Sequence, residues 1–171
     1  YYNSSLTTLT IPDDVDGDGS QDVYGPYLID DSYIGGDSAQ CTASTWVSKA
    51  SAAWEAANPG KDINAYRHRL LIVPNYWNWG NRHCGWGGVA QLNCGTWCWA
   101  IAADPVTILH GVIVHELGHN LGLHHASFDT DNNGSIDTNG EYSDSSDQMG
   151  GSRNWMKFNP PHFEDKGWHD N

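Results

Sequence analysis

The stretch that decides how this sequence folds is His115-Glu116-Leu117-Gly118-His119-Asn120-Leu121-Gly122-Leu123-His124-His125. Residues four apart lie one above the other on a helix, so His115 and His119 can aim two imidazole nitrogens at one metal ion. Glu116 can face the same cleft without being a ligand, which places it within reach of a metal-bound water. The stretch therefore predicts a zinc site on a helix, with a carboxylate beside it.

Gly122 and His125 complete the pattern. Glycine tolerates a positive φ, so the chain can turn sharply at Gly122 and bring His125 back under the metal. Three protein ligands leave one coordination position open for water, which distinguishes a catalytic zinc site from a closed structural one. His110 and His124 lack this spacing, and we expect them to be ordinary core or surface residues.

The chemistry expected of such a site is hydrolysis. Zinc lowers the pKa of its bound water and polarises the carbonyl under attack. Glu116 would then act as the general base, taking the proton of the zinc-bound water and delivering it to the leaving amine.

The apolar pattern around the motif predicts a helix over about 105–121. Asp104 suits the N-cap and Pro105 the first helical position. Further elements follow from periodicity and turn residues. They are a helix over 42–57, a central strand over 66–74, a strand over 86–92, a strand over 97–102 that pairs back against it, and a short helix near 160–166.

The motif resembles the zinc signature of the metzincin metallopeptidases. That clan also requires a methionine in a tight turn beneath the metal, and Met149 in Glu141–Gly150 (EYSDSSDQMG) matches it. Within the clan the chain is most similar to the gametolysin-type peptidases, over roughly Trp54 to Trp168. The stretches that carry this resemblance are Cys84–Ala90 (CGWGGVA), His115–Ala126 (HELGHNLGLHHA), Glu141–Gly150, and Asn159–His162 (NPPH) followed by Gly167-Trp168.

The resemblance implies an α+β catalytic domain over residues 1–171, with a twisted mixed sheet and two long helices. An N-terminal subdomain would cover 1–122, and an irregular C-terminal subdomain with the Met-turn would cover 123–171. It also implies a secreted zinc endopeptidase that binds protein or peptide substrates along an edge strand, here at Gly88, Val89 and Ala90. Gly151 stands where some relatives carry a tyrosine ligand, so we expect no such ligand here. Ala126 argues against the astacins and adamalysins.

Charge excludes some partners. The 171 residues include 21 acidic and 8 basic residues, a formal net charge of −13. Nucleic acid and anionic membranes need clustered Lys and Arg, which this chain lacks. No apolar run approaches the roughly 20 residues that span a bilayer, so we expect no membrane insertion. We expect a monomer.

The four cysteines indicate two disulfides and an oxidising compartment. Three pairings are possible, and we favour Cys41–Cys84 with Cys94–Cys98. The alternative is a cysteine-based zinc site, which is disfavoured because the chain has no C-x-x-C pair.

Two Asp-rich loops have most of the spacing of an EF-hand calcium loop, although each has glycine where the bidentate glutamate belongs. A solvated turn cluster is the alternative interpretation. We expect structural Ca²⁺ in both. The candidate ligands are Asp14, Asp16, Asp18 and Asp22 in the first loop, and Asp129, Asp131, Asn133 and Asp137 in the second.

Two other functions compete with the peptidase. One is a catalytically inactive, calcium-dependent extracellular binding module on a metzincin-like scaffold, which the Asp-rich loops and the tryptophans at 77–99 would suit. The other is a zinc hydrolase that acts on a non-peptide bond. The intact glutamate and all three histidines of the motif disfavour the inactive module.

Overall fold

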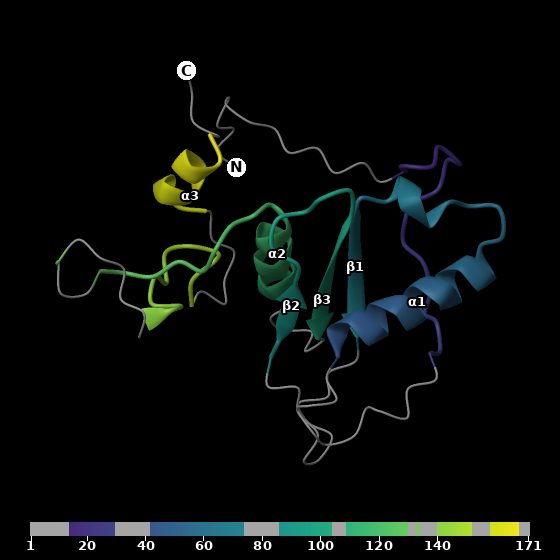
Figure 1. The fold of residues 1–171 in the computed structure, drawn as a ribbon, viewed down its shortest axis with the longest axis horizontal. Coiled ribbons are helices and arrows are strands. Elements are labelled where there is room, and N and C mark those ends of the chain that lie inside the picture. The colour runs from purple at the N-terminus through teal and green to yellow at the C-terminus, as the bar shows by residue number, and fades with distance from the viewer. Residues whose placement is uncertain are drawn as a thin grey trace, which may run out of the picture.

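We analysed a computed structural model of the chain. The structure describes residues 14–29, 42–73, 86–103, 109–129, 133, 140–151 and 158–167. Its elements, in chain order, are α1 (Ala43–Ala57), the 3₁₀-helix η2 (Ile63–Ala65), β1 (His68–Val73), β2 (Gly88–Ala90), β3 (Cys98–Ala103), α2 (Leu109–Asn120) and α3 (Pro160–Asp165). Together they form a small α+β fold with the two longer helices packed beside a three-stranded sheet (Figure 1).

The sheet is mixed, with the strand order β1-β3-β2. β1 runs parallel to β3, and β2 runs antiparallel to β3 with Val89 opposite Ile101. The predicted pairing of the second and third strands is thus confirmed. β2 is shorter than the predicted strand over 86–92 and spans Gly88–Ala90.

The prediction that residues 66–74 form a central strand is wrong for the described sheet, where β3 is central and β1 lies at an edge. Along β1 exposed and half-buried residues alternate, and Leu70 and Ile72 leave 36% and 55% of their surface in solvent. β3 is buried on both faces at almost every position. The apolar run of β1 resembles a doubly covered strand, yet only one of its faces is covered.

α1 covers one face of the sheet. Trp46 and Val47 on this helix form a buried cluster with Ile101 of β3, and the half-buried Leu71 and Val73 of β1 pack against it. The helix has the predicted bounds within a residue. Asn58 follows its last turn and donates its backbone N–H to Trp54 O at 2.9 Å.

α2 lies against the other face, where the strands carry small residues. Ala100 and Ala102 of β3 are fully buried, and Gly88 of β2 lies opposite Ala102 in the ladder. A Cβ atom at Gly88 would lie 2.7 Å from Val112 Cγ1 and 2.5 Å from Glu116 Oε1, both on α2. The small side chains therefore let α2 approach the sheet closely, and this approach fixes the position of its histidines.

The C-terminal end of α2 is held by hydrogen bonds. Gly122 has φ of +86° and donates to His119 O at 2.8 Å, while Leu123 N donates to Gly118 O at 3.0 Å. These two bonds are the Schellman arrangement in which a left-handed residue ends a helix. The predicted turn at Gly122 is confirmed, and the helix ends at Asn120. Its predicted start at Asp104 and Pro105 lies outside the described residues.

None of the helices that the structure describes is long and apolar enough to cross a membrane.

The difference in burial between β3 and β1 can be tested by making the same Ile→Val substitution in each strand. Ile101→Val removes a methylene from a fully buried site and should lower the free energy of unfolding by about 1 kcal/mol. Ile72→Val is the matched control on the half-covered β1 and should change it by less than about 0.5 kcal/mol. Urea denaturation measures both, and equal losses would contradict the edge position of β1.

Candidate metal centre

Three imidazoles meet at the end of α2. His115 and His119 come from successive turns of the helix, and His125 returns to them after the turn at Gly122. Their ligand atoms all lie within 4.8 Å of one another, and His119 Nε2 lies 3.1 Å from His125 Nε2. The structure thus brings together the three residues that the spacing predicts to bind zinc.

Each of these imidazoles is oriented by a hydrogen bond at Nδ1. His115 Nδ1 lies 3.0 Å from the backbone oxygen of Gln148, and His119 Nδ1 lies 2.8 Å from that of Leu123. His125 Nδ1 lies 2.7 Å from Glu141 Oε1. All three partners are acceptors, so each Nδ1 carries the proton and each Nε2 keeps a free lone pair. Metal-binding histidines are oriented in this manner by carbonyl and carboxylate partners.

The arrangement fits a divalent metal. Four tetrahedral ligands at about 2.0–2.1 Å from zinc would place two imidazole nitrogens about 3.3 Å apart. The observed Nε2 separation is close to this value, and two facing lone pairs at that distance repel unless a cation lies between them. Burial lowers the pKa of His115, and burial lowers the pKa of His119 to about 4. Both rings are therefore neutral at pH 7, the form that binds metal.

Glu116 is placed on α2 next to this site and is 5% exposed. Burial raises the pKa of its carboxyl group to about 8. A divalent cation beside it would oppose this effect, because an adjacent positive charge favours the carboxylate. Its Oε1 lies over Gly88, in the space that a side chain at that position would occupy. The candidate base therefore lies between the histidines and the predicted substrate strand β2.

Met149 is fully buried and lies against α2 at Gly118. It packs with Leu123 and Ala126, and its Sδ lies against Gly118, where a Cβ atom would collide with it. Ala126 N donates to Met149 O at 3.0 Å, so the strand-like segment after His125 is tied to the turn that carries the methionine. Met149 thus packs against the helix that carries His115 and His119.

Two buried carboxylates, missed by sequence reasoning, hold the segment that carries Met149. Asp147 is fully buried and accepts hydrogen bonds from Met149 N at 2.6 Å and from Asn159 N. Its Oδ2 also lies 3.1 Å from His162 Nδ1 on α3. Asp144 Oδ2 accepts a bond from the Asn159 side chain at 2.9 Å. These bonds connect the methionine turn to α3.

Glu141 and Tyr142 are further site residues that the spacing did not indicate. Glu141 orients His125 as described, and the Tyr142 ring centroid lies 4.1 Å from that of His125 and 6.0 Å from that of His115. Tyr142 is 48% exposed, so it covers the histidines on the solvent side. The signal available in the sequence was their position just upstream of Met149. His124 is exposed and outside the cluster, as expected.

The first predicted calcium loop gathers oxygen ligands. Carboxylate oxygens of Asp14, Asp16 and Asp18 lie within 4.8 Å of one another. However, Lys61 Nζ lies 2.6 Å from Asp16 and 2.5 Å from Asp18, so one ammonium group already offsets part of their negative charge. Calcium stays a prediction at this loop. In the second loop Asp131 and Asp137 lie outside the described residues, and Asn133 N donates to Asp129 Oδ1 at 3.1 Å.

The disulfide Cys94–Cys98 is present, as predicted. Cys41 and Cys84, the other predicted pair, lie outside the described residues. His68 lies beside the two sulfurs, which the sequence did not indicate.

A comparison with protein families shows which family the chain belongs to. The model of the gametolysin peptidase M11 family matches residues 19–170, nearly the whole chain. The chain belongs to this family. The gametolysin peptidases are metallopeptidases, which accords with a metal centre built from the three histidines. No curated protein and no solved structure matches the chain.

The contact between Gly118 and Met149 can be tested in this gametolysin-family chain. In an open helix Gly→Ala stabilises by about 1 kcal/mol. Here the added methyl group meets the buried Met149 sulfur, and overpacking of this kind costs about 1–3 kcal/mol. We therefore expect Gly118→Ala to lower the melting temperature. Gly95→Ala is the control, since nothing lies within 4 Å of a Cβ there. A more stable Gly118→Ala variant would show that Met149 does not pack against the helix.

Proposed function

We propose that the chain is a zinc-dependent endopeptidase that hydrolyses peptide bonds of extracellular proteins. The observation that carries this proposal is the set of three imidazoles whose Nδ1 atoms are all engaged by acceptors and whose Nε2 atoms face one point. The family supports a peptide hydrolase that uses a metal. Secretion agrees with the disulfide, since disulfides persist in oxidising compartments.

His115, His119 and His125 would hold the zinc ion. Three neutral nitrogen ligands are the donor set of known catalytic zinc sites and leave a coordination position free. When bound, zinc supplies Lewis-acid chemistry: it makes water more acidic at neutral pH and polarises a carbonyl group. Glu141 strengthens His125 as a donor, because a carboxylate on Nδ1 increases the basicity of the ring.

Glu116 is the general base of the proposal. Its carboxylate takes a proton from the attacking water and passes it to the amine that leaves when the peptide bond breaks. Its seclusion from bulk water keeps that proton within the site. The raised pKa from burial assists proton uptake by Glu116, and its carboxyl group would stay ionised before the reaction beside a bound divalent cation.

The substrate would lie along β2. This strand is at an edge of the described sheet, so the backbone groups of Gly88, Val89 and Ala90 that face away from β3 can pair with an extended peptide. Glu116 of α2 lies over Gly88 of β2, so the base would lie beside a peptide that binds along this strand. Met149 is assigned as the Met-turn residue, because it is buried under the helix that carries two of the histidines.

The role of Glu116 predicts a loss of turnover without a loss of metal. Glu116→Gln should retain one zinc per chain and lower kcat/KM for a casein-derived peptide by about 10²–10⁴-fold, the contribution of a general base. Glu55→Gln, on the exposed side of α1, is the matched control and should leave the zinc content and kcat/KM unchanged. Metal analysis and peptide hydrolysis measure the two quantities. Near-normal turnover of the Glu116 variant would refute the role.

Casein zymography separates the peptidase from the inactive module. The zinc-loaded chain should clear casein, and a zinc-selective chelator should abolish the clearing. A zinc-loaded, folded chain that cleaves no peptide would favour the binding module on the same scaffold.

We further propose Ca²⁺ at the first Asp-rich loop. Asp14 accepts hydrogen bonds from Asp18 N at 3.0 Å and from Gly19 N at 2.9 Å, which folds the loop around the carboxylates. Calcium takes six to eight oxygen ligands and would compete with Lys61 for Asp16 and Asp18.

This competition predicts that Lys61→Met binds Ca²⁺ more tightly than the unmodified chain. Calcium should raise the melting temperature of both proteins, and more so for Lys61→Met, with zinc still bound. Lys49→Met, on α1, is the control for loss of a lysine and should respond like the unmodified chain. Differential scanning fluorimetry with and without Ca²⁺ tests this, and no shift in either protein would count against a calcium loop.

A further inference from the structure

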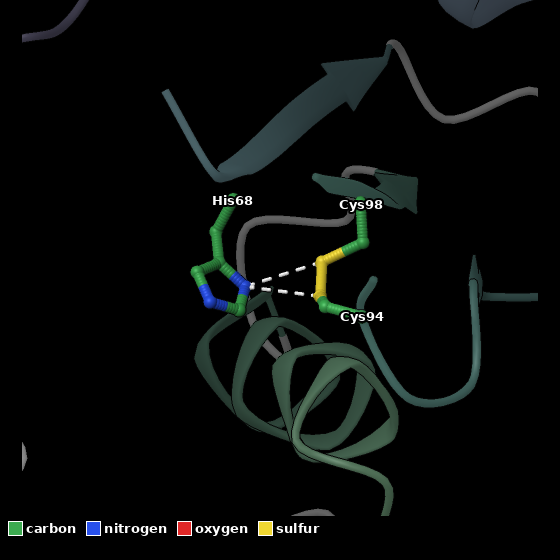
Figure 2. Close-up of side chains that lie close together, drawn as sticks. All are labelled: His68, Cys94 and Cys98. Carbon is green, nitrogen blue, oxygen red and sulfur yellow. Dashed lines mark hydrogen bonds between the residues drawn. A yellow bond between two sulfur atoms is a disulfide. The ribbon is translucent and has the colours of Figure 1, made fainter. Parts of the chain in front are cut away.

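A second group of metal-binding side chains lies where β1 and β3 begin. His68 is the first residue of β1 and is paired in register with Cys98, the first residue of β3. Cys94 reaches the same point from the loop before β3 (Figure 2). Together His68, Cys94 and Cys98 offer one nitrogen and two sulfur atoms within 4.8 Å of one another. None of them belongs to the three-histidine centre.

The distances in this group match those of a metal site. His68 Nδ1 lies 3.5 Å from Cys94 Sγ and 3.3 Å from Cys98 Sγ. A tetrahedral zinc ion with nitrogen at about 2.0–2.1 Å and sulfur at about 2.3 Å separates such ligands by about 3.6 Å. Both nitrogen–sulfur separations are thus close to the required values while the sulfurs form a disulfide. Only the separation of the two sulfurs has to increase.

The backbone that carries the ligands is fixed. Cys98 N donates to Arg67 O at 2.8 Å, next to His68 on β1. Cys94 N donates to Asn120 O at 3.0 Å, at the end of α2. The three side chains therefore come from segments whose backbones are held together by hydrogen bonds.

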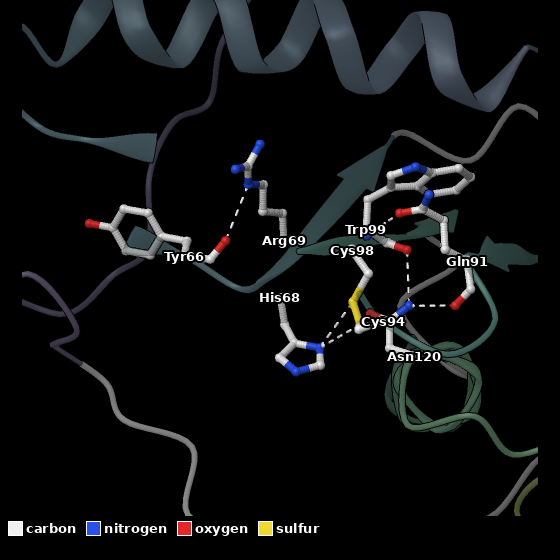
Figure 3. The surroundings of a disulfide bond; sticks show 8 residues. All are labelled: Tyr66, His68, Arg69, Gln91, Cys94, Cys98, Trp99 and Asn120. Atoms are coloured by element: carbon white, nitrogen blue, oxygen red, sulfur yellow. Dashed lines mark hydrogen bonds between the residues drawn. A yellow bond between two sulfur atoms is a disulfide. The ribbon is translucent and has the colours of Figure 1, made fainter. Parts of the chain in front are cut away.

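The polar surroundings also favour a ligand. Asn120 is 2% exposed, and its side-chain N–H groups donate to Gln91 O at 2.9 Å and Trp99 O at 3.1 Å. Among the described residues, its Oδ1 is the buried side-chain polar atom without a hydrogen-bond partner. Asn120 lies next to the disulfide (Figure 3), so an unused oxygen acceptor borders the group. His68 is exposed and Cys94 half-buried, which leaves a path from solvent.

We propose that His68, Cys94 and Cys98 form a second metal site, which takes a thiophilic divalent cation such as Zn²⁺ when the disulfide is reduced. Two thiolates and one imidazole are a known zinc donor set, and a fourth position remains for water or a neighbouring oxygen. In the oxidised chain the same residues form the disulfide, so the site exists in one redox state only.

The conversion is balanced with a thiol or phosphine reductant. Two thiol equivalents reduce the Cys94–Cys98 bond, which gives two cysteine thiols and one disulfide of the reductant. With a phosphine, one equivalent is oxidised to the phosphine oxide, and one water molecule supplies its oxygen and the two protons of the cysteine thiols. The sulfurs then move apart to van der Waals contact, close to the separation of about 3.8 Å in a tetrahedral zinc site. Each thiol loses a proton when the metal binds, and His68 binds through Nδ1 with its proton on the exposed Nε2.

Cobalt distinguishes this site from the first one, because only thiolate ligands give intense sulfur-to-cobalt charge-transfer absorption in the near ultraviolet. The chain is reduced with a phosphine, which does not compete for the metal, and titrated with Co²⁺. We expect the charge-transfer band and two Co²⁺ per reduced chain, against one Co²⁺ and no band for the oxidised chain.

Variants assign the ligands. Cys94→Ser with Cys98→Ser should abolish the band, whereas Cys41→Ser with Cys84→Ser should retain it. His68→Ala should weaken Co²⁺ binding at this site at least about tenfold, by analogy with the loss caused by removing even an outer partner of a ligand. His124→Ala, which removes another exposed histidine, should leave the band and its affinity unchanged.

Three results would overturn the proposal. They are a reduced chain without the band, a band that depends on Cys41 and Cys84 alone, and a band of unchanged affinity in His68→Ala. Should a cysteine variant fail to fold, the exposed His68 substitution still decides the question. Peptide hydrolysis is not measured in this experiment, so its outcome for the second site does not depend on whether the chain is a peptidase.

Discussion

The three-histidine cluster depends on one backbone constraint, the left-handed turn at Gly122 that follows α2. Its φ of +86° and the two hydrogen bonds to Gly118 O and His119 O reverse the chain within a few residues. Without the reversal His125 would continue along the helix axis, and the third imidazole could not meet the other two. The same turn places Leu123 O where it accepts the Nδ1 proton of His119. One conformation of a single residue thus brings His125 into the cluster and orients His119.

Contacts from the segment around Met149 fix the orientation of His115 and His125. The backbone oxygen of Gln148 and the carboxylate of Glu141 come from the segment around Met149, which is fastened by the buried Asp147 and Asp144. Breaking that segment would release His115 and His125 together. The irregular C-terminal part therefore has a clear physical role: it contributes little regular structure, and it fixes the protonation and direction of two imidazoles.

The sheet contributes through its small residues. Ala100, Ala102 and Gly88 face α2 and let the helix sit close, so Glu116 reaches over Gly88 toward the edge strand. The loop with Cys94 binds the last carbonyls of the same helix, since Asn93 N donates to His119 O at 2.8 Å. α2 is thus held at its side by the sheet and at its end by the disulfide loop. This shared attachment places the three-histidine cluster and the Cys94–Cys98 loop at the same end of α2.

The sequence by itself determined the helix of the motif, the turn at Gly122 that follows it, and the meeting of the three histidines. These follow from local rules: the four-residue repeat of a helix and the φ that glycine allows. The sequence favoured the Cys94–Cys98 bond but left three pairings of the four cysteines open. Only the tertiary structure decided that β3 and not β1 is central in the described sheet, because apolar character does not reveal how many faces of a strand are covered. It alone also brought Glu141, Tyr142, Asp147 and His68 to their partners. These contacts join residues far apart in the chain, and no spacing rule encodes a distance that the packing of separate elements sets.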